Sequence, residues 1–128
     1  MRPGTATDIV LLSAEWPARA LLRAELLEAG FEVVAADAWP AARRHLGTGS
    51  KPRLVIVDLR GLPDSDAVLH DLRVLMKSNV LVVRGAGSPP PHDLERLGFT
   101  SVSRPTSIGA IVAAARRMLG IPAGSASR

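Results

Sequence analysis

The sequence has 128 residues, no cysteine and a formal net charge of +4. This length allows one domain with a hydrophobic core, and the lack of cysteine excludes disulfides, thiolate chemistry and Cys-type zinc sites. Aromatic residues make up only 3% of the chain, which argues against the base-stacking surface that single-stranded nucleic acids need.

Five short, mostly apolar runs predict β-strands, and each is followed by a segment with helical periodicity. The predicted strands cover residues 8–13, 32–36, 53–58, 80–84 and 100–103. The predicted helices cover residues 16–29, 38–46, 67–76, 92–98 and 108–119. Strands that alternate with amphipathic helices form a parallel sheet with helices on both faces. We therefore predict an α/β fold with a five-stranded parallel sheet, a (βα)5 three-layer sandwich of the flavodoxin type.

The first and last predicted helices carry the clearest end signals. The first has Pro17 in its opening turn and stops at Gly30, as helices commonly do. Its apolar residues recur at helical spacing: Ala18, Leu21, Leu22, Leu26 and Ala29. Either Thr106 or Ser107 can cap the last helix. We expect one domain, residues 1–128, with its core at about 8–119 and a frayed tail at 120–128.

Candidate functional residues follow the strands, because open parallel sheets bind ligands outside the carboxyl ends of their strands. Asp58 ends the apolar run 54–57 and precedes a turn rich in Gly and Pro, so its carboxylate belongs at the mouth of the sheet rather than in the core. The other strand-end residues are Ser13, Ala14 and Glu15 after the first strand, Arg84 after the fourth, and Arg104 and Pro105 after the fifth.

Two of these segments resemble a known family. "LVIVDLRGLP" (54–63) is similar to the phosphoacceptor segment of the CheY-like receiver domains of two-component response regulators, and "SVSRPTS" (101–107) is similar to the segment where that family has a Lys-Pro pair. The strand and helix order matches from about Asp8 to Leu119. The resemblance implies a receiver fold with Asp58 at the phosphoacceptor position.

The resemblance also implies that most of the family's site residues are replaced. Ser13 and Ala14 stand where the family has two acids that help to hold Mg²⁺, and Glu15 is only third in that row. The family's Thr or Ser after the fourth strand is Arg84 here, and its switch aromatic is Val102. Its Lys is Arg104, which keeps the charge but changes the geometry, and Pro105 is retained. The chain thus resembles a degenerate receiver, a pseudo-receiver.

The residues themselves suggest what replaces the metal. Magnesium takes carboxylate, phosphate and water oxygens, and phosphoryl transfer depends on it to neutralise charge. With one carboxylate and two arginines at the strand ends, we expect Asp58 to pair with Arg84 or Arg104. The competing interpretation of Asp58 is a turn residue that accepts backbone hydrogen bonds.

Other motifs carry weaker signals. "RGAG" (84–87) lacks the third glycine and the acid of a dinucleotide site and is followed by three prolines, which we interpret as stiffening the loop. Asp64 and Asp66 could bind a metal, but a solvated turn with Asp66 as N-cap of the next helix is the preferred interpretation. Trp16 and Trp39 are expected to pack, with Trp16 filling space that metal and water take in active relatives.

The sequence therefore predicts a stand-alone atypical receiver domain that works by protein contacts rather than as an enzyme. It is expected to be cytoplasmic, without membrane or direct nucleic-acid binding, and without cofactor or metal. A histidine kinase or other signalling protein is the expected kind of partner, and a homodimer stays open. One alternative is a receiver still phosphorylated on Asp58 by a histidine kinase, with Glu15 and Asp58 holding Mg²⁺. Another is a small nucleotide-binding protein or enzyme on the same fold.

Overall fold

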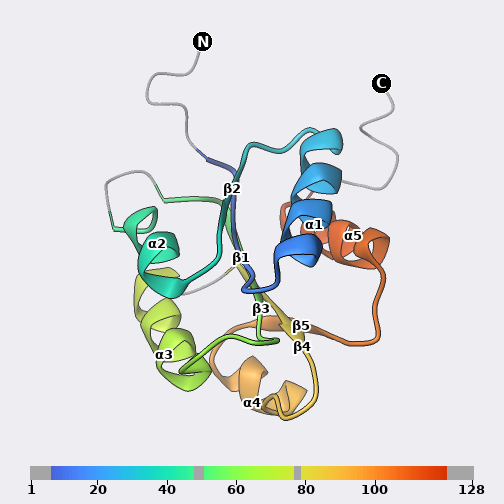
Figure 1. Ribbon diagram of the computed structural model, residues 1–128. Coiled ribbons are helices and arrows are strands. Elements are labelled where there is room, and N and C mark those ends of the chain that lie inside the picture. The colour runs from blue at the N-terminus through green and yellow to red at the C-terminus, as the bar shows by residue number, and fades with distance from the viewer. Residues whose placement is uncertain (1–6, 48–50, 77–78, 121–128) are drawn as a thin grey trace.

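The computed structural model describes residues 7–47, 51–76 and 79–120, which form one sheet flanked by helices (Figure 1). The strands are β1 (Ile9–Leu12), β2 (Val33–Ala36), β3 (Leu54–Asp58), β4 (Val80–Arg84) and β5 (Thr100–Ser103). The helices are α1 (Trp16–Glu28), α2 (Trp39–Arg44), α3 (Ser65–Met76), α4 (Pro91–Arg96) and α5 (Ile108–Met118). Each predicted element is present, and the predicted α/β fold with five parallel strands is confirmed.

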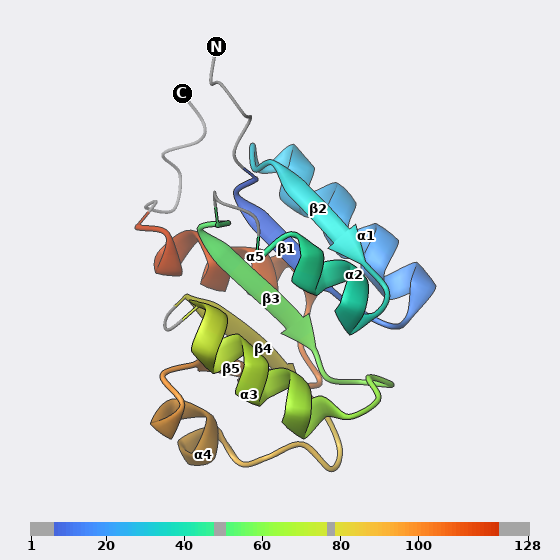
Figure 2. The same cartoon turned by 90° about the vertical axis from the view of Figure 1, so that its left-hand side faces the viewer.

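The sheet has the strand order β2-β1-β3-β4-β5, with every pair parallel (Figure 2). The chain adds β2 on one side of β1 and then adds β3, β4 and β5 on the other side, so the connections change direction between β1 and β3. Sheets of this kind bind ligands in the crevice at that switch point. Leu12 pairs in register with Val57, so Ser13 and Asp58 leave the sheet beside each other. The topology therefore brings two of the predicted site residues to one edge.

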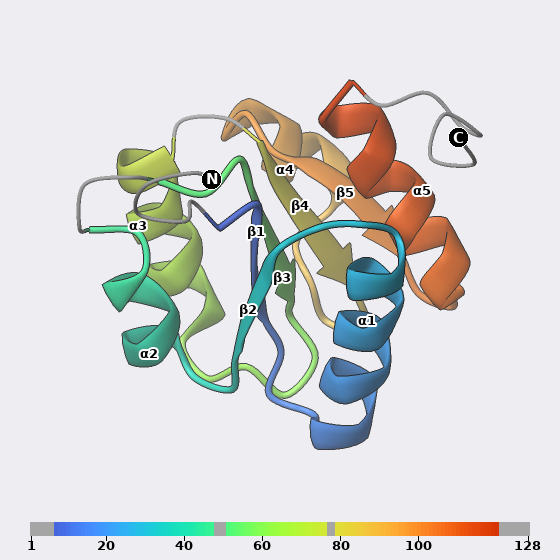
Figure 3. The same ribbon diagram turned by 90° about the horizontal axis from the view of Figure 1, so that it is seen from above.

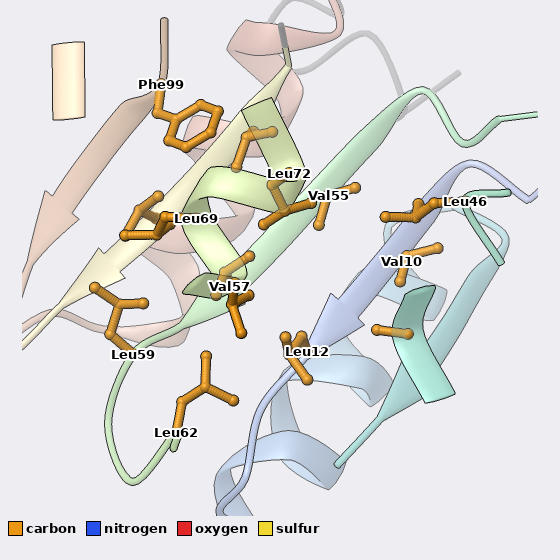
Figure 4. Packing of buried hydrophobic residues seen from close by; sticks show 14 of the residues in the cluster. Val10, Leu12, Leu46, Val55, Val57, Leu59, Leu62, Leu69, Leu72 and Phe99 are labelled. Carbon is orange, nitrogen blue, oxygen red and sulfur yellow. The ribbon is translucent and has the colours of Figure 1, made fainter. Parts of the chain in front are cut away.

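The two faces of the sheet carry separate hydrophobic cores, because alternate strand residues point to opposite sides. Helices α2, α3 and α4 cover one face, and α1 and α5 cover the other (Figures 1 and 3). The first core joins Val10, Val55 and Val57 of the strands to Leu69 and Leu72 of α3 (Figure 4). Strands β1, β3 and β4 are buried on both faces, which explains why their sequences are nearly continuous apolar runs, whereas β5 at the edge of the sheet is partly exposed and more polar.

Several predicted helix ends are confirmed. Pro17 lies in the first turn of α1, and Gly30 has a φ of +99° just beyond the helix. Of the two candidate caps of α5, Ser107 is the N-cap, because its Oγ accepts a hydrogen bond from the Ala110 N–H at 3.0 Å. The predicted frayed tail is 120–128, and of it residues 121–128 lie outside the described residues.

One predicted cap is wrong. Helix α3 begins at Ser65, two residues earlier than predicted, so Asp66 lies inside its first turn rather than at the N-cap. A carboxylate in the first turn still interacts favourably with the positive end of the helix dipole. Asp66 therefore supports the start of α3 in a different way from the one predicted.

Two apolar residues of α1 are more exposed than predicted. Trp16 is 68% exposed and Leu21 is 58% exposed, whereas Leu22 and Leu26 are buried. The prediction that Trp16 packs and fills a metal site is therefore wrong. Trp39 is half-buried against the first core, and its Nε1–H donates to Asp71 Oδ2 at 3.1 Å.

None of the helices in the described ranges combines the length and the apolar character that crossing a bilayer would take.

Candidate functional site

Asp58 lies at the carboxyl end of β3 and is only 3% exposed. Its Oδ2 accepts a hydrogen bond of 2.6 Å from Arg104 Nη2. Its Oδ1 accepts one of 3.0 Å from the backbone N–H of Arg60. Both interpretations of this residue therefore hold at once: Asp58 closes the turn after β3, and it forms an ion pair.

Arg104 reaches Asp58 across the end of β4. Its backbone N–H donates to the Arg84 carbonyl at 2.9 Å, which fixes the chain just after β5. A Cβ placed on Gly85 would lie 4.0 Å from Arg104 Cδ, so the side chain passes over the glycine that follows β4. The peptide bond between Arg104 and Pro105 is cis. The ion pair thus links the carboxyl ends of β3 and β5.

The ion pair between Arg104 and Asp58 is strong because it is largely shielded from water. The side chain of Asp58 is 4% exposed and that of Arg104 is 24% exposed. A charged donor and a charged acceptor form shorter and stronger hydrogen bonds than neutral ones, and little water is present to screen this pair. Because a buried carboxylate without a partner is costly, Arg104 stabilises the side chain of Asp58 at this place.

Arg84, the other predicted partner of Asp58, is engaged elsewhere. Its Nε–H donates to the Pro89 carbonyl at 2.6 Å, and its Nη1 donates to Ser103 Oγ at 2.6 Å. The possibility that Arg84 pairs with Asp58 is therefore wrong. Arg84 instead ties the loop after β4 to the end of β5.

The structure predicts a local effect of removing Arg84. The change Arg84→Ala should raise amide exchange rates in residues 85–88, because it frees the Pro89 carbonyl that holds this loop. It should leave exchange at Asp58 and Leu59 unchanged, because neither contacts Arg84 in the described hydrogen bonds. Hydrogen exchange read by mass spectrometry distinguishes these segments. Faster exchange around Asp58 would instead place Arg84 in the site.

Two arginines that the sequence analysis did not single out complete the surroundings. Arg60 lies between two acids, with Nε 3.6 Å from Glu15 Oε1 and Nη2 3.9 Å from Asp58 Oδ2. Arg19 Nη1 donates to the Ser13 carbonyl at 2.9 Å. The nearness of Arg60 to Asp58 could have been foreseen, since a strand-end Asp commonly binds the backbone two residues later. The contact of Arg19 with the Ser13 carbonyl could not have been foreseen from the sequence.

Ser13, Ala14 and Val102 occupy the places that the sequence assigned to them but add no charge. Ser13 is 2% exposed, and its Oγ has no hydrogen-bond partner among the described residues. The methyl group of Ala14 lies near Gly61. Val102 is partly buried against the core under α1 and α5.

The residues at this edge do not fit a magnesium site. Magnesium needs several oxygen ligands in octahedral geometry. Within residues 7–47, 51–76 and 79–120, no group of three or more His, Asp and Glu side chains could hold a metal ion. Both oxygens of Asp58 already accept hydrogen bonds, and an arginine lies where a cation would neutralise the carboxylate.

Comparisons with known proteins match the architecture. The receiver domain of NtrX from Brucella abortus superposes with a TM-score of 0.75 at 24% identity, covering 90% of this chain and 100% of that one. A response regulator receiver protein from Sinorhizobium medicae has a TM-score of 0.71 at 20% identity, covering 91% and 96%. A structure described as adenylate cyclase from Rhodopirellula baltica has 0.71 at 20%, covering 90% and 88%.

The other two comparisons add no relative. No protein-family model matches the sequence, and no curated protein matches it. The structural likenesses, at 24% identity or less, concern the fold alone. The chain has the fold of the response-regulator receiver domains.

Proposed function

We propose that this chain is a receiver-like signalling domain that acts through protein contacts and is not phosphorylated by the magnesium-dependent reaction. The fold supports the signalling role. The observation that carries the second part is the 2.6 Å hydrogen bond between Arg104 Nη2 and the buried Oδ2 of Asp58.

This ion pair opposes phosphoryl transfer to Asp58 in two ways. A hydrogen bond from a guanidinium withdraws electron density from the carboxylate that would attack phosphorus, and here Oδ2 accepts from Arg104 while Oδ1 accepts from the Arg60 N–H. The transferring phosphoryl group also needs a metal ion to neutralise its charge. Here a fixed guanidinium balances the charge of the carboxylate, but it brings no open coordination positions for phosphate oxygens. We therefore expect the domain to hold one conformation without switching by phosphorylation.

A receiver still phosphorylated on Asp58 is the second candidate, because one observation favours it. Arg60 lies between Glu15 and Asp58, so the acid that would have to help hold Mg²⁺ is near the acceptor. These contacts are 3.6 and 3.9 Å long and the side chains of Arg60 and Glu15 are 41% and 44% exposed, so they are easily broken. In this candidate a histidine kinase is the partner and Mg²⁺ the cofactor.

Exposure to acetyl phosphate or beryllofluoride with Mg²⁺ separates the two candidates. Our proposal predicts no mass increase and unchanged amide chemical shifts at residues 57–61. An Asp58→Asn variant is the matched control, because it keeps the size of the side chain but removes the acceptor oxygen. A mass adduct on the native protein that is missing from Asp58→Asn would overturn the proposal in favour of the phosphorylated receiver.

The nucleotide-binding or enzymatic alternative has no supporting observation in the described residues. A thermal-shift screen with nucleotides tests it, and saturable stabilisation by one nucleotide would favour that class. We propose contact with a protein partner instead, and the identity of that partner is the question to pursue by capture on the intact domain.

A further inference from the structure

Helix α1 is apolar on its outward face as well as on its inward face. Leu22 and Leu26 are buried in the core beneath the helix. Three of the four large apolar side chains that are exposed in the described part of the chain also belong to α1: Trp16, Leu21 and Leu27. The outer side of α1 faces away from both α5 and the sheet (Figure 3). A helix that is apolar all round is normally covered on every side, so the outward face of α1 indicates an interaction surface.

The exposed residues of α1 follow the spacing of a coiled-coil seam. In the heptad notation abcdefg, Pro17 and Ala24 take a positions, while Ala20 and Leu27 take d positions, and all four residues are exposed. We call these four residues the α1 seam. The buried Leu22 takes an f position, on the side opposite the seam. The two alanines at the middle are small, which lets a second helix approach closely. The spacing therefore suits a facing helix.

The residues beside the α1 seam determine which way a second α1 can run. Trp16 and Arg23 take g positions, and Leu21 and Glu28 take e positions. In a parallel pair, each g residue meets the e residue of the next heptad in the partner. Arg23 would then face the partner's Glu28, and Trp16 would face the partner's Leu21. In an antiparallel pair the two Arg23 side chains would share one flank and the two Glu28 side chains the other. The charges therefore complement each other only in the parallel pair.

Arg23 and Glu28 are available for this contact. Both side chains are exposed, and neither takes part in an ion pair within residues 7–47, 51–76 and 79–120. They do not face each other on their own helix, because neighbours on a helix surface are three or four residues apart. A second copy of α1 supplies each of them with an opposite charge.

We propose that two copies of this chain form a parallel two-fold dimer through the α1 seam, with ion pairs between Arg23 and the partner's Glu28. A two-fold contact uses the same surface on both subunits, which the pattern of α1 satisfies. A helix of 13 residues gives a small interface, so we expect a weak dimer with a Kd on the order of 10 µM. The contact does not involve Asp58. The inference therefore goes beyond the proposed function, and a monomeric chain would leave that proposal standing.

Sedimentation of the native full chain, at concentrations from about tenfold below to about tenfold above this Kd, tests the proposal. We expect the average mass to rise from that of the monomer toward twice that value. Ala20→Glu should leave the chain monomeric, because it brings two carboxylates together in the seam. Arg23→Glu should weaken the dimer about tenfold, since each of two ion pairs becomes a pair of like charges. Adding Glu28→Arg to that variant should restore the affinity.

A cross-linking experiment tests the orientation of the two helices. In a parallel two-fold pair, each seam residue faces the same residue of the partner. The chain has no cysteine of its own, so Ala24→Cys places a single thiol on each copy. Mild oxidation should then give a disulfide-linked dimer. The same change in the Ala20→Glu background should give none.

The substituted residues are exposed, so each variant should keep the Tm of the native chain. Val74→Glu is the matched control, because Val74 is 74% exposed on α3 and α3 covers the other face of the sheet; it should dimerise as the native chain does. The proposal is overturned by a native chain that stays monomeric at about ten times the expected Kd, or by a dimer that persists in Ala20→Glu. Undiminished affinity in Arg23→Glu or the absence of a cross-link in Ala24→Cys would also overturn it.

Discussion

Replacing Arg104 by alanine is expected to lower the free energy of unfolding by about 3 kcal/mol, the lower end of the range for breaking a buried ion pair. The cost comes from Asp58, whose side chain is 4% exposed and whose carboxylate would keep only Arg60 as a partner, through the backbone N–H at 3.0 Å and the guanidinium at 3.9 Å. The value lies at the lower end because the side chain of Arg104 is 24% exposed and water can enter the space that it leaves. Urea unfolding of both proteins measures the difference.

A double-mutant cycle with Asp58→Asn identifies the cause. In the Asp58→Asn background, Arg104→Ala should cost about 1 kcal/mol, because no unpaired charge remains buried. Arg104→Lys should fall between the native protein and Arg104→Ala, since it keeps the charge but loses the planar donor group. If Arg104→Ala cost the same in both backgrounds, the two side chains would not be coupled and the ion pair would contribute nothing.

Replacing Leu26 by alanine is expected to lower the free energy of unfolding by about 2–5 kcal/mol, the range for a buried leucine that leaves a cavity. Leu26 is completely buried in the core beneath α1 and α5, beside Leu22 and Phe31. Urea or thermal unfolding of the single variant tests this.

The neighbouring leucine is a matched control for this change. Leu27 has the same side chain in the same helix but is 41% exposed, so Leu27→Ala should cost less than about 1 kcal/mol. Equal costs at the two positions would mean that α1 is rotated about its axis relative to the sheet.

The fold could be predicted because its determinants are local. The apolar runs 54–57 and 80–83 are strands buried on both faces. Uninterrupted apolar runs of this length are typical of such strands and too short for a buried helix. Gly30 and Ser107 mark helix ends through their own backbone and side-chain geometry. The order of alternating strands and helices then restricts the topology to a few right-handed arrangements.

The site was less predictable because it depends on contacts between distant residues. The sequence placed Arg84 and Arg104 after adjacent strands, but only the structure shows that Arg84 is bound by Pro89 and Ser103 while Arg104 reaches Asp58. Trp16 and Leu21 follow the apolar pattern of α1 yet are exposed, since the rotation of a short helix on a sheet is set by packing rather than by spacing. The helix period alone cannot give that rotation.

The central claim is that an internal arginine holds the Asp58 carboxylate in place of a metal ion. Titration of the native chain with Mg²⁺, followed by the amide shifts of Ser13, Asp58 and Arg60, tests it most directly. The ion pair between Arg104 and Asp58 predicts no saturable shift up to millimolar Mg²⁺, because the guanidinium already balances the carboxylate charge that would attract the ion. Saturable shifts centred on Asp58 at submillimolar Mg²⁺ would contradict it.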